Sequence, residues 1–82
     1  MITVQFFARY RELLNQDQAH MHWDEHLDTV GALRNRLVDR GEPWILLSEP
    51  RLMCARNQEL CNLDEPLRDG DEIAFFPPVT GG

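Results

Sequence analysis

Lysine is absent from this chain of 82 residues, in which all eight basic residues are arginine. No side chain can therefore accept a modifier through a lysine isopeptide bond. Apolar runs are also short, and none approaches the roughly 20 residues of a membrane span. The first residues lack the basic segment and apolar segment of a signal peptide. We expect a cytoplasmic protein with no membrane partner.

Positive charge is scarce as well. Fourteen acidic residues against eight basic ones give a net charge of −6, whereas nucleic-acid binding needs clustered Lys and Arg. We therefore expect no nucleic-acid partner, and an acidic domain is better suited to a basic protein surface. The length allows one domain, and a chain this short is not expected to enclose a deep active site of its own.

Residues that bind metals or form disulfides are few. Cys54 and Cys61 have neither C-x-x-C nor zinc-site spacing, so we interpret them as small buried side chains on neighbouring strands. His20 and His22 would share one face of a strand, which suits chelation, and His26 follows nearby. No motif supplies a fourth ligand, so we interpret these histidines as exposed surface residues and predict no metal site.

Periodicity predicts two strands and a short helix in the first part of the chain. Residues 2–7 alternate between two faces and predict a half-buried strand. Residues 8–15 follow with the spacing of a short helix, on whose apolar side we place Leu13. Residues 18–23 predict a second strand, and residues 43–47 are too short for an element of their own.

The main helix is predicted from Thr29. Threonine is a good N-cap, and Val30, Leu33 and Leu37 form an apolar stripe behind it. Gly41 is a plausible helix stop. This helix has the length to cover one face of a sheet.

The second half predicts three more strands. Residues 51–63 predict a hairpin with a tight turn at Asn57-Gln58. A turn at Asp69-Gly70 precedes a last strand at 72–76, which Pro77 ends because proline cannot donate to a sheet ladder.

These elements predict an α+β fold with a mixed sheet covered by one main helix. The last strand is expected beside the first, which is the β-grasp, or ubiquitin-like, arrangement. Residues 1–76 would form the domain and residues 77–82 an extended tail ending in Gly-Gly.

The ending "FFPPVTGG" suggests that the tail is the working part. Pro77-Pro78 favours an extended chain with a reach of at most about 20 Å to Gly82. Gly81 and Gly82 lack side chains and could pass a slot that any Cβ would block. A terminal carboxylate is inert until ATP converts it to an acyl-adenylate. A sulfur nucleophile would then leave a thiocarboxylate, and an amine an isopeptide.

An apolar patch is expected at the base of this tail. If Ile73 and Phe75 face the helix, then Phe7 and Phe76 point away from it, and Leu60 joins them if its strand presents that side. Loops could cover these side chains, but an exposed patch beside a tail normally marks a docking site. We favour docking.

Four segments resemble one family: "RELL", "TVGALRNRL", "ARNQEL" and "LRDGDEIAFFPPVTGG". They are similar to the sulfur-carrier small subunits of molybdopterin synthase. The resemblance implies that an adenylyltransferase similar to ubiquitin activators uses ATP to activate Gly82, and that a sulfur-relay protein converts it to a thiocarboxylate. The tail would enter the large synthase subunit, in a 2:2 assembly, and give its sulfur to cyclic pyranopterin monophosphate to build the molybdopterin dithiolene.

This resemblance also implies the site residues. The large subunit would supply the catalytic side chains, so the chain acts in catalysis only as the sulfur donor, with no bound cofactor, through Gly82 and with Gly81 giving access. Partners would contact Phe7, Leu60 and Phe76 and the tail residues Pro77, Pro78, Val79 and Thr80. Alternatives are a sulfur carrier for thiamine or tRNA thiolation, a ubiquitin-like modifier, or a binding module with an inert tail.

Overall fold

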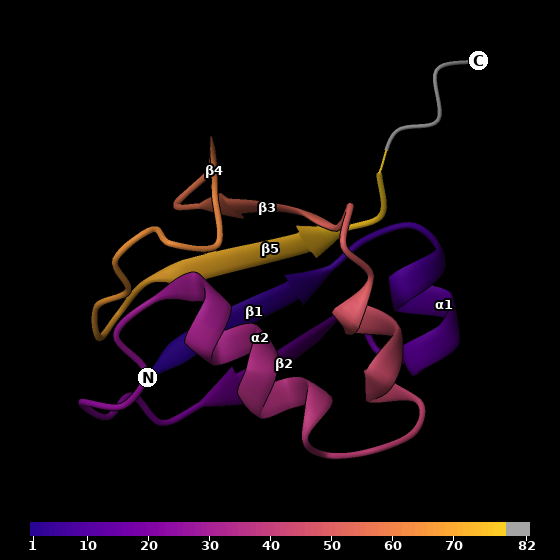
Figure 1. The fold of residues 1–82 in the computed structure, drawn as a ribbon, viewed down its shortest axis with the longest axis horizontal. Coiled ribbons are helices and arrows are strands. Elements are labelled where there is room, and N and C mark those ends of the chain that lie inside the picture. Colours follow the sequence, from indigo (N-terminus) through magenta and orange to yellow (C-terminus); the bar gives the residue numbers. More distant parts are fainter. Residues whose placement is uncertain (79–82) are drawn as a thin grey trace.

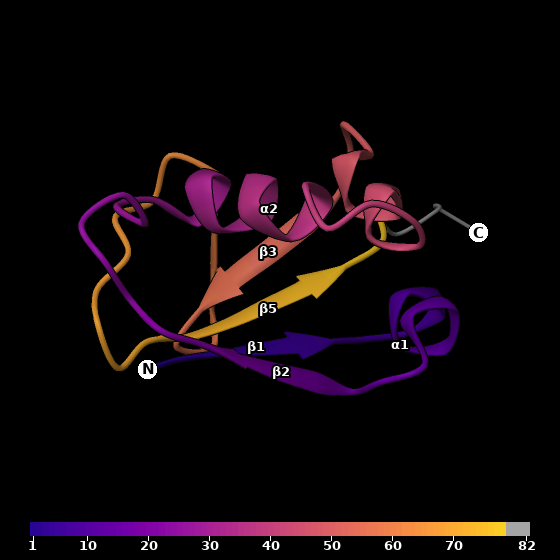
Figure 2. The ribbon, with the colours of Figure 1, turned by 90° about the horizontal axis from the view of Figure 1, so that it is seen from below.

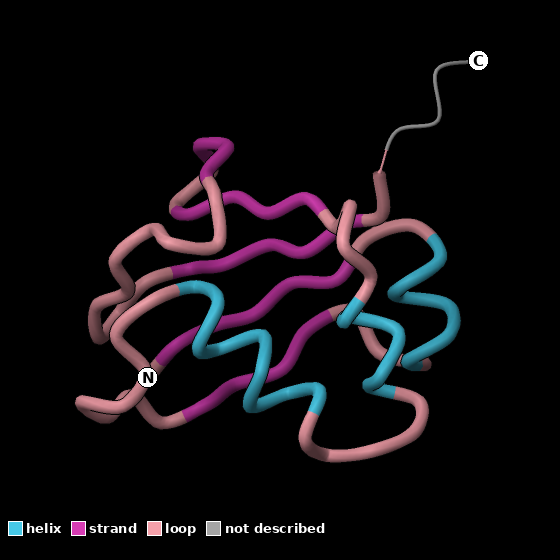
Figure 3. The backbone as a smooth tube through the Cα atoms, in the orientation of Figure 1, coloured by secondary structure: helices cyan, strands magenta, loops and turns pink. Residues whose placement is uncertain are grey.

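A mixed sheet runs through the molecule with strand order β2-β1-β5-β3-β4, seen in a computed structural model that describes residues 1–78 (Figures 1 and 3). Its strands are β1 (Ile2–Phe6), β2 (Gln18–Met21), β3 (Met53–Arg56), β4 (Glu59–Cys61) and β5 (Glu72–Phe76). The helical segments within these residues are α1 (Arg9–Leu14), α2 (Val30–Val38) and the 3₁₀ helix η1 (Trp44–Ser48).

The first and last strands are neighbours at the centre of the sheet, as predicted. They pair in parallel, with Val4 opposite Ile73 and Phe6 opposite Phe75. The other three pairings, β1 with β2, β3 with β5 and β3 with β4, are antiparallel. Both strands are flanked on either side by another strand, and all four residues named here are buried.

Helix α2 lies across one face of this sheet (Figure 2). Its predicted cap is confirmed, since the Ala32 amide donates to Thr29 Oγ1 at 3.1 Å. The predicted stripe of Val30, Leu33 and Leu37 is fully buried. The chain leaves the helix after Val38 and turns at Gly41, whose φ of 86° is one that glycine adopts without strain.

Three local predictions need correction. Leu13 is 58% exposed, because the six-residue helix α1 buries a narrow stripe made by Tyr10 and Leu14, one turn apart. Residues 43–47 do contribute an element, since η1 begins at Trp44 and buries Leu47 against the core. Some strands are shorter than predicted: β2 ends at Met21 and not at residue 23, and the hairpin strands span Met53–Arg56 and Glu59–Cys61 within the predicted range of 51–63.

The fold class is the one predicted. One main helix packs on a mixed sheet, which is the α+β β-grasp arrangement. The opposite face of the sheet carries no helix among the described residues (Figure 2). None of the helices in this part of the chain has the length and apolar character needed to cross a bilayer.

Candidate docking surface and tail

The helix-free face of the sheet carries three large apolar side chains. Phe7 is 43% exposed and Leu60 is 70% exposed, and Phe76 is partly buried. Strand alternation explains the arrangement, because Phe6 and Phe75 face the core and their successors must face the other way. We call Phe7, Leu60 and Phe76 the sheet-face patch. The structure places all three as predicted.

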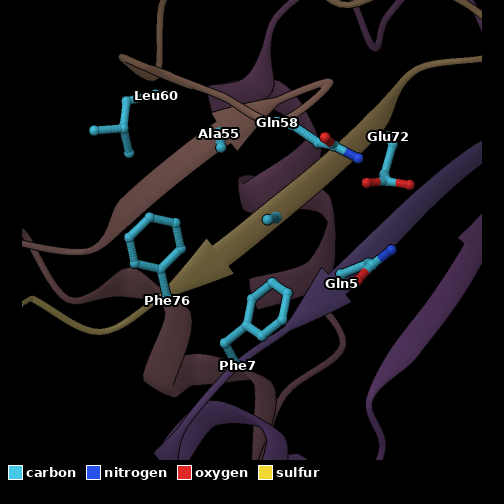
Figure 4. A pocket seen from close by; sticks show the side chains of 8 residues that line it. Gln5, Phe7, Ala55, Gln58, Leu60, Glu72 and Phe76 are labelled. Carbon is cyan, nitrogen blue, oxygen red and sulfur yellow. The ribbon is translucent and has the colours of Figure 1, made fainter.

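A hollow of about 630 Å³ lies over the sheet-face patch (Figure 4). Its lining comes from four strands, the hairpin turn and the residue that follows β1, and it consists of Gln5, Phe7, Ala55, Gln58, Leu60, Glu72, Ala74 and Phe76. The two phenylalanines lie near the C-terminal end of β5, while Gln5 and Glu72 lie at the opposite end of the hollow (Figure 4). The hollow therefore has an apolar end and a polar end.

The sequence reasoning missed the polar end and the floor of this hollow. Gln5, Glu72 and Ala74 occupy the same strand phase as Phe7 and Phe76, so period-two alternation could have identified them. Ala55 and Gln58 depend on the register of the hairpin, in which Ala55 pairs with Leu60. That register follows from the turn conformation and is harder to derive from sequence.

The hairpin turn positions Leu60 over the sheet. Asn57 and Gln58 have φ values of 50° and 72°, so both central residues are left-handed, as in the type I′ turns that suit the twist of paired strands. The two-residue turn sets Arg56 opposite Glu59 and Ala55 opposite Leu60. Leu60 thereby faces the same side of the sheet as Phe76.

A buried carboxylate fixes this turn to the start of β5. Asp71, 7% exposed, accepts hydrogen bonds from Arg56 Nε at 2.8 Å, Asn57 Nδ2 at 3.0 Å and the Arg68 amide at 2.8 Å. Burial by itself raises the pKa of Asp71, but these hydrogen bonds outweigh it and lower the pKa below its ordinary value of 3.8. Arg56 also donates to Glu65 at 3.1 Å. Its guanidinium group therefore forms ion pairs with two carboxylates, those of Asp71 and Glu65.

The tail leaves the sheet beside the patch. Strand β5 ends at Phe76, and Pro77 and Pro78 follow as partly buried residues outside the sheet. In Figure 1 the chain exits at the end of the sheet where α1 lies. The predictions for Val79, Thr80, Gly81 and Gly82 fall outside the described residues and stay predictions.

The remaining candidates separate into two groups. His20, His22 and His26 are all exposed, as predicted. In residues 1–78 no group of three or more His, Cys, Asp or Glu side chains is placed to hold a metal ion. Cys54 and Cys61 lie on neighbouring strands as predicted, and both are free thiols, although only Cys54 is buried.

A β-grasp sheet with one helix-covered face, an apolar patch on the other and a Pro-Pro exit beside it defines a ubiquitin-like protein. The chain matches the ThiS family over residues 4–82. It is 48% identical over 83 aligned positions to the molybdopterin synthase sulfur carrier subunit of Escherichia coli, with the whole of both chains covered. The chain belongs to the ThiS family, and within it to the sulfur carrier subunits of molybdopterin synthase.

Solved structures share this fold. A small archaeal modifier protein of Haloferax volcanii superposes with a TM-score of 0.77 at 27% identity, covering 95% of this chain and 97% of that one. A Helicobacter pylori chain from a complex of subunits 1 and 2 of molybdopterin-converting factor gives 0.66 at 27% identity, with 99% and 97% covered. Modifier and carrier relatives therefore share this fold, and the high-identity relatives are carriers.

Proposed function

We propose that this sulfur carrier works through a thiocarboxylate on Gly82, which donates sulfur to cyclic pyranopterin monophosphate in the large subunit of molybdopterin synthase. Two such donations build the dithiolene of molybdopterin. The observation that carries the proposal is the hollow over Phe7, Leu60 and Phe76, which lies beside the exit of the tail. An exposed apolar hollow at the base of a projecting tail is suited to holding a partner while the tail enters that partner's active site.

The chemistry at the tail requires activation. The carboxylate of Gly82 is ionised at neutral pH and resists nucleophiles. In the proposed first step its oxygen attacks the α-phosphorus of ATP, and pyrophosphate leaves. The terminal sulfur of a persulfide on a relay protein then attacks the acyl carbon of the adenylate, and AMP leaves with the bonding electrons. A further thiol attacks the relay sulfur of the resulting acyl disulfide, which breaks the S–S bond, frees the thiocarboxylate and leaves the relay protein in a disulfide with that thiol. Glycine at the penultimate position, Gly81, would let the chain end pass a narrow entrance.

The division of labour follows from the size of the chain. The described surface has an open hollow rather than an enclosed cavity, so we assign to the chain the role of sulfur donor and to the large subunit the catalytic side chains. A separate adenylyltransferase would bind ATP, and the carrier itself would hold no cofactor. We expect Pro77, Pro78, Val79 and Thr80 to lie in the partner's channel, in a 2:2 assembly of carrier and large subunit.

The cell compartment belongs to the same proposal. ATP and reduced sulfur donors are available in the cytoplasm, where thiols also stay reduced. We therefore expect the carrier to act there.

Intact mass tests the proposal directly. The protein is incubated with ATP, a sulfur source and the cognate adenylyltransferase, and we expect a mass gain equal to the difference between sulfur and oxygen. The matched control is the chain with Gly82 deleted, which should keep its mass. An unchanged mass of the intact chain, in a mixture that sulfurates a known carrier, would refute the thiocarboxylate. Transfer of the sulfur to cyclic pyranopterin monophosphate on adding the large subunit then tests the acceptor.

A further inference from the structure

Two thiols face each other across the β3–β4 hairpin. Cys54 and Cys61 are Cα partners in the antiparallel register, and their Sγ atoms are 3.7 Å apart. The Cys54 thiol also donates to the Cys61 carbonyl oxygen at 3.3 Å. Directly opposed residues of antiparallel strands have Cα atoms about 4.5–5.5 Å apart. That spacing lies inside the range of about 4.4–6.8 Å that a disulfide spans.

We propose that Cys54 and Cys61 form an oxidation site that closes to a cross-strand disulfide within the folded monomer. The backbone already has suitable spacing, so side-chain rotation accounts for most of the approach from 3.7 Å to a bond of about 2.05 Å. The pairing is intramolecular because both residues belong to one hairpin, whose turn contains only Asn57 and Gln58.

The two thiols differ in access. Cys54 is 3% exposed and belongs to the core, whereas Cys61 is partly exposed and packs against it. A hollow of about 350 Å³ is lined by both cysteines together with Leu52, Met53, Leu60 and Asn62. A small oxidant therefore has a route to the pair and meets Cys61 first.

Burial also sets the speed of the reaction. It raises the pKa of Cys54 to about 12, and burial likewise raises the pKa of Cys61. Thiolate is the reactive form in thiol–disulfide exchange. Little thiolate is accordingly present at neutral pH, so oxidation should be slow there and should accelerate as the pH rises.

A low-molecular-weight disulfide supplies the oxidising equivalents. The Cys61 thiolate attacks one sulfur of oxidised glutathione, forming a mixed disulfide and releasing one glutathione thiolate. The Cys54 thiolate then attacks Cys61 Sγ, the protein disulfide forms, and the second glutathione thiolate leaves. The two protons lost by the cysteines end on the two released glutathiones, so two cysteines are oxidised and one disulfide is reduced.

A disulfide between Cys54 and Cys61 would lie next to the sheet-face patch. Strand β4 lies at the edge of the sheet and pairs, among the described strands, with β3 alone. Cys61 faces the core side of β4, and its neighbour Leu60 faces the hollow of the sheet-face patch. A covalent link at Cys61 would hold the edge strand that carries Leu60, and we expect amide exchange in β4 to slow by about tenfold or more.

The test equilibrates the reduced full chain in glutathione buffers, from fully reduced to fully oxidised, at about pH 8, where more thiolate is present. Samples are quenched with acid, unfolded, alkylated with N-ethylmaleimide and weighed intact. We expect a monomer that is lighter by about 2 Da and takes up no N-ethylmaleimide, while its circular dichroism stays that of the reduced chain. The reduced protein should take up two N-ethylmaleimide groups, one on each cysteine.

Two variants assign the order of attack. Cys54→Ser keeps the accessible thiol and should stop at one glutathione adduct. Cys61→Ser keeps only the buried thiol and should gain neither adduct nor disulfide in the folded state.

Four results would overturn the proposal. The intact chain could retain two alkylatable thiols in the fully oxidised buffer, stop at a glutathione adduct, become a covalent dimer, or lose its fold on oxidation. None of these measurements involves Gly82, so the test of the disulfide is independent of the test of the proposed sulfur transfer.

Discussion

Phe6 on β1 and Phe75 on β5 lie opposite each other at the end of the parallel strand pair, and both are buried. Each is followed by a second phenylalanine, Phe7 or Phe76, which alternation sends to the helix-free face. The same two dipeptides therefore complete the core and begin the docking surface. Because Pro77 follows immediately, the exit of the tail is fixed relative to that surface.

Truncating Leu60 separates docking from folding. Leu60 is 70% exposed, so Leu60→Ala should change the free energy of unfolding by no more than about 0.5 kcal/mol. If Leu60 anchors a partner, the same change should weaken binding of the large synthase subunit by about tenfold or more, or roughly 1.4 kcal/mol. Isothermal titration calorimetry measures the affinity, and urea unfolding measures the stability.

Leu13 is the matched control for that experiment. It is 58% exposed but lies on α1, away from the lining of the hollow. Leu13→Ala should leave both stability and affinity nearly unchanged. Equal affinities for the two variants would contradict docking through the sheet-face patch.

Local sequence rules predicted the parts of this fold that depend on short-range physics. The alternation of residues 2–7 identified the core face of β1, and Thr29 identified the start of α2. Both features follow from backbone geometry and one neighbouring hydrogen bond. The sheet-face patch followed from the same alternation, which is why Phe7 and Phe76 were placed correctly.

Long-range contacts were beyond those rules. Asp71 directly follows the predicted Asp69-Gly70 turn, but its bonds to Arg56 and Asn57 join segments about 15 residues apart in the chain, which no local pattern indicates. Leu13 was misplaced because the short helix α1 has apolar residues on more sides than it can bury. The 3₁₀ helix around Leu47 owes its order to core packing, since such short helices have little stability alone.

Removing the charge of Asp71 should loosen the hairpin. Asp71→Asn breaks a buried ion pair with Arg56 and should lower the free energy of unfolding by about 2–3 kcal/mol at pH 7. Urea unfolding measures the loss. Asp64→Asn, a change of the same chemistry at an exposed position, should cost less than about 0.5 kcal/mol. Equal costs would show that the Asp71 contacts contribute little.

The pH dependence of that loss has a defined sign. The pKa of Asp71 is below 3.8 in the folded chain, so its contribution is fully present above about pH 4 and is lost as the pH falls through the folded pKa. The stability gap between the wild-type chain and Asp71→Asn should therefore narrow below about pH 4. A gap that widens on acidification would contradict the lowered pKa.

Gly31 offers a test in which two effects oppose each other. Alanine is favoured over glycine by about 1 kcal/mol inside a helix, but a Cβ at Gly31 would lie 2.9 Å from the Leu63 carbonyl oxygen. That oxygen also accepts a hydrogen bond from the Gly31 amide at 2.7 Å, so the backbone must move and weaken the contact. We expect steric overlap to prevail, and Gly31→Ala to cost about 1–2 kcal/mol in urea unfolding.

Asn35 provides the reference for helix propensity. It lies in the same helix and is exposed, so Asn35→Ala should be more stable than Asn35→Gly by about 1 kcal/mol. If Gly31→Ala gained stability by a similar amount, the packing of α2 on residue Leu63 would be looser than the structure indicates.

Tyr10 should resist ionisation in the folded protein. It is 1% exposed, and its hydroxyl donates to Glu49. Burial, followed by the hydrogen bond to the Glu49 carboxylate, raises the pKa of Tyr10 well above its ordinary value of 10.0. As the one tyrosine of the chain, it can be followed without ambiguity by phenolate absorbance at about 295 nm.

The sign of the effect on stability follows from proton binding. Above pH 10 the unfolded chain loses the phenol proton while the folded chain keeps it, so stability falls as the pH rises, by up to about 1.4 kcal/mol per pH unit from this group. Tyr10→Phe removes the contribution of Tyr10 to the pH dependence of the free energy of unfolding. The contributions of the other titrating groups, including Cys54, remain. We expect phenolate absorbance in the wild-type chain to appear only with alkaline unfolding. A folded protein that titrates near pH 10 would show that the Tyr10–Glu49 contact does not hold in solution.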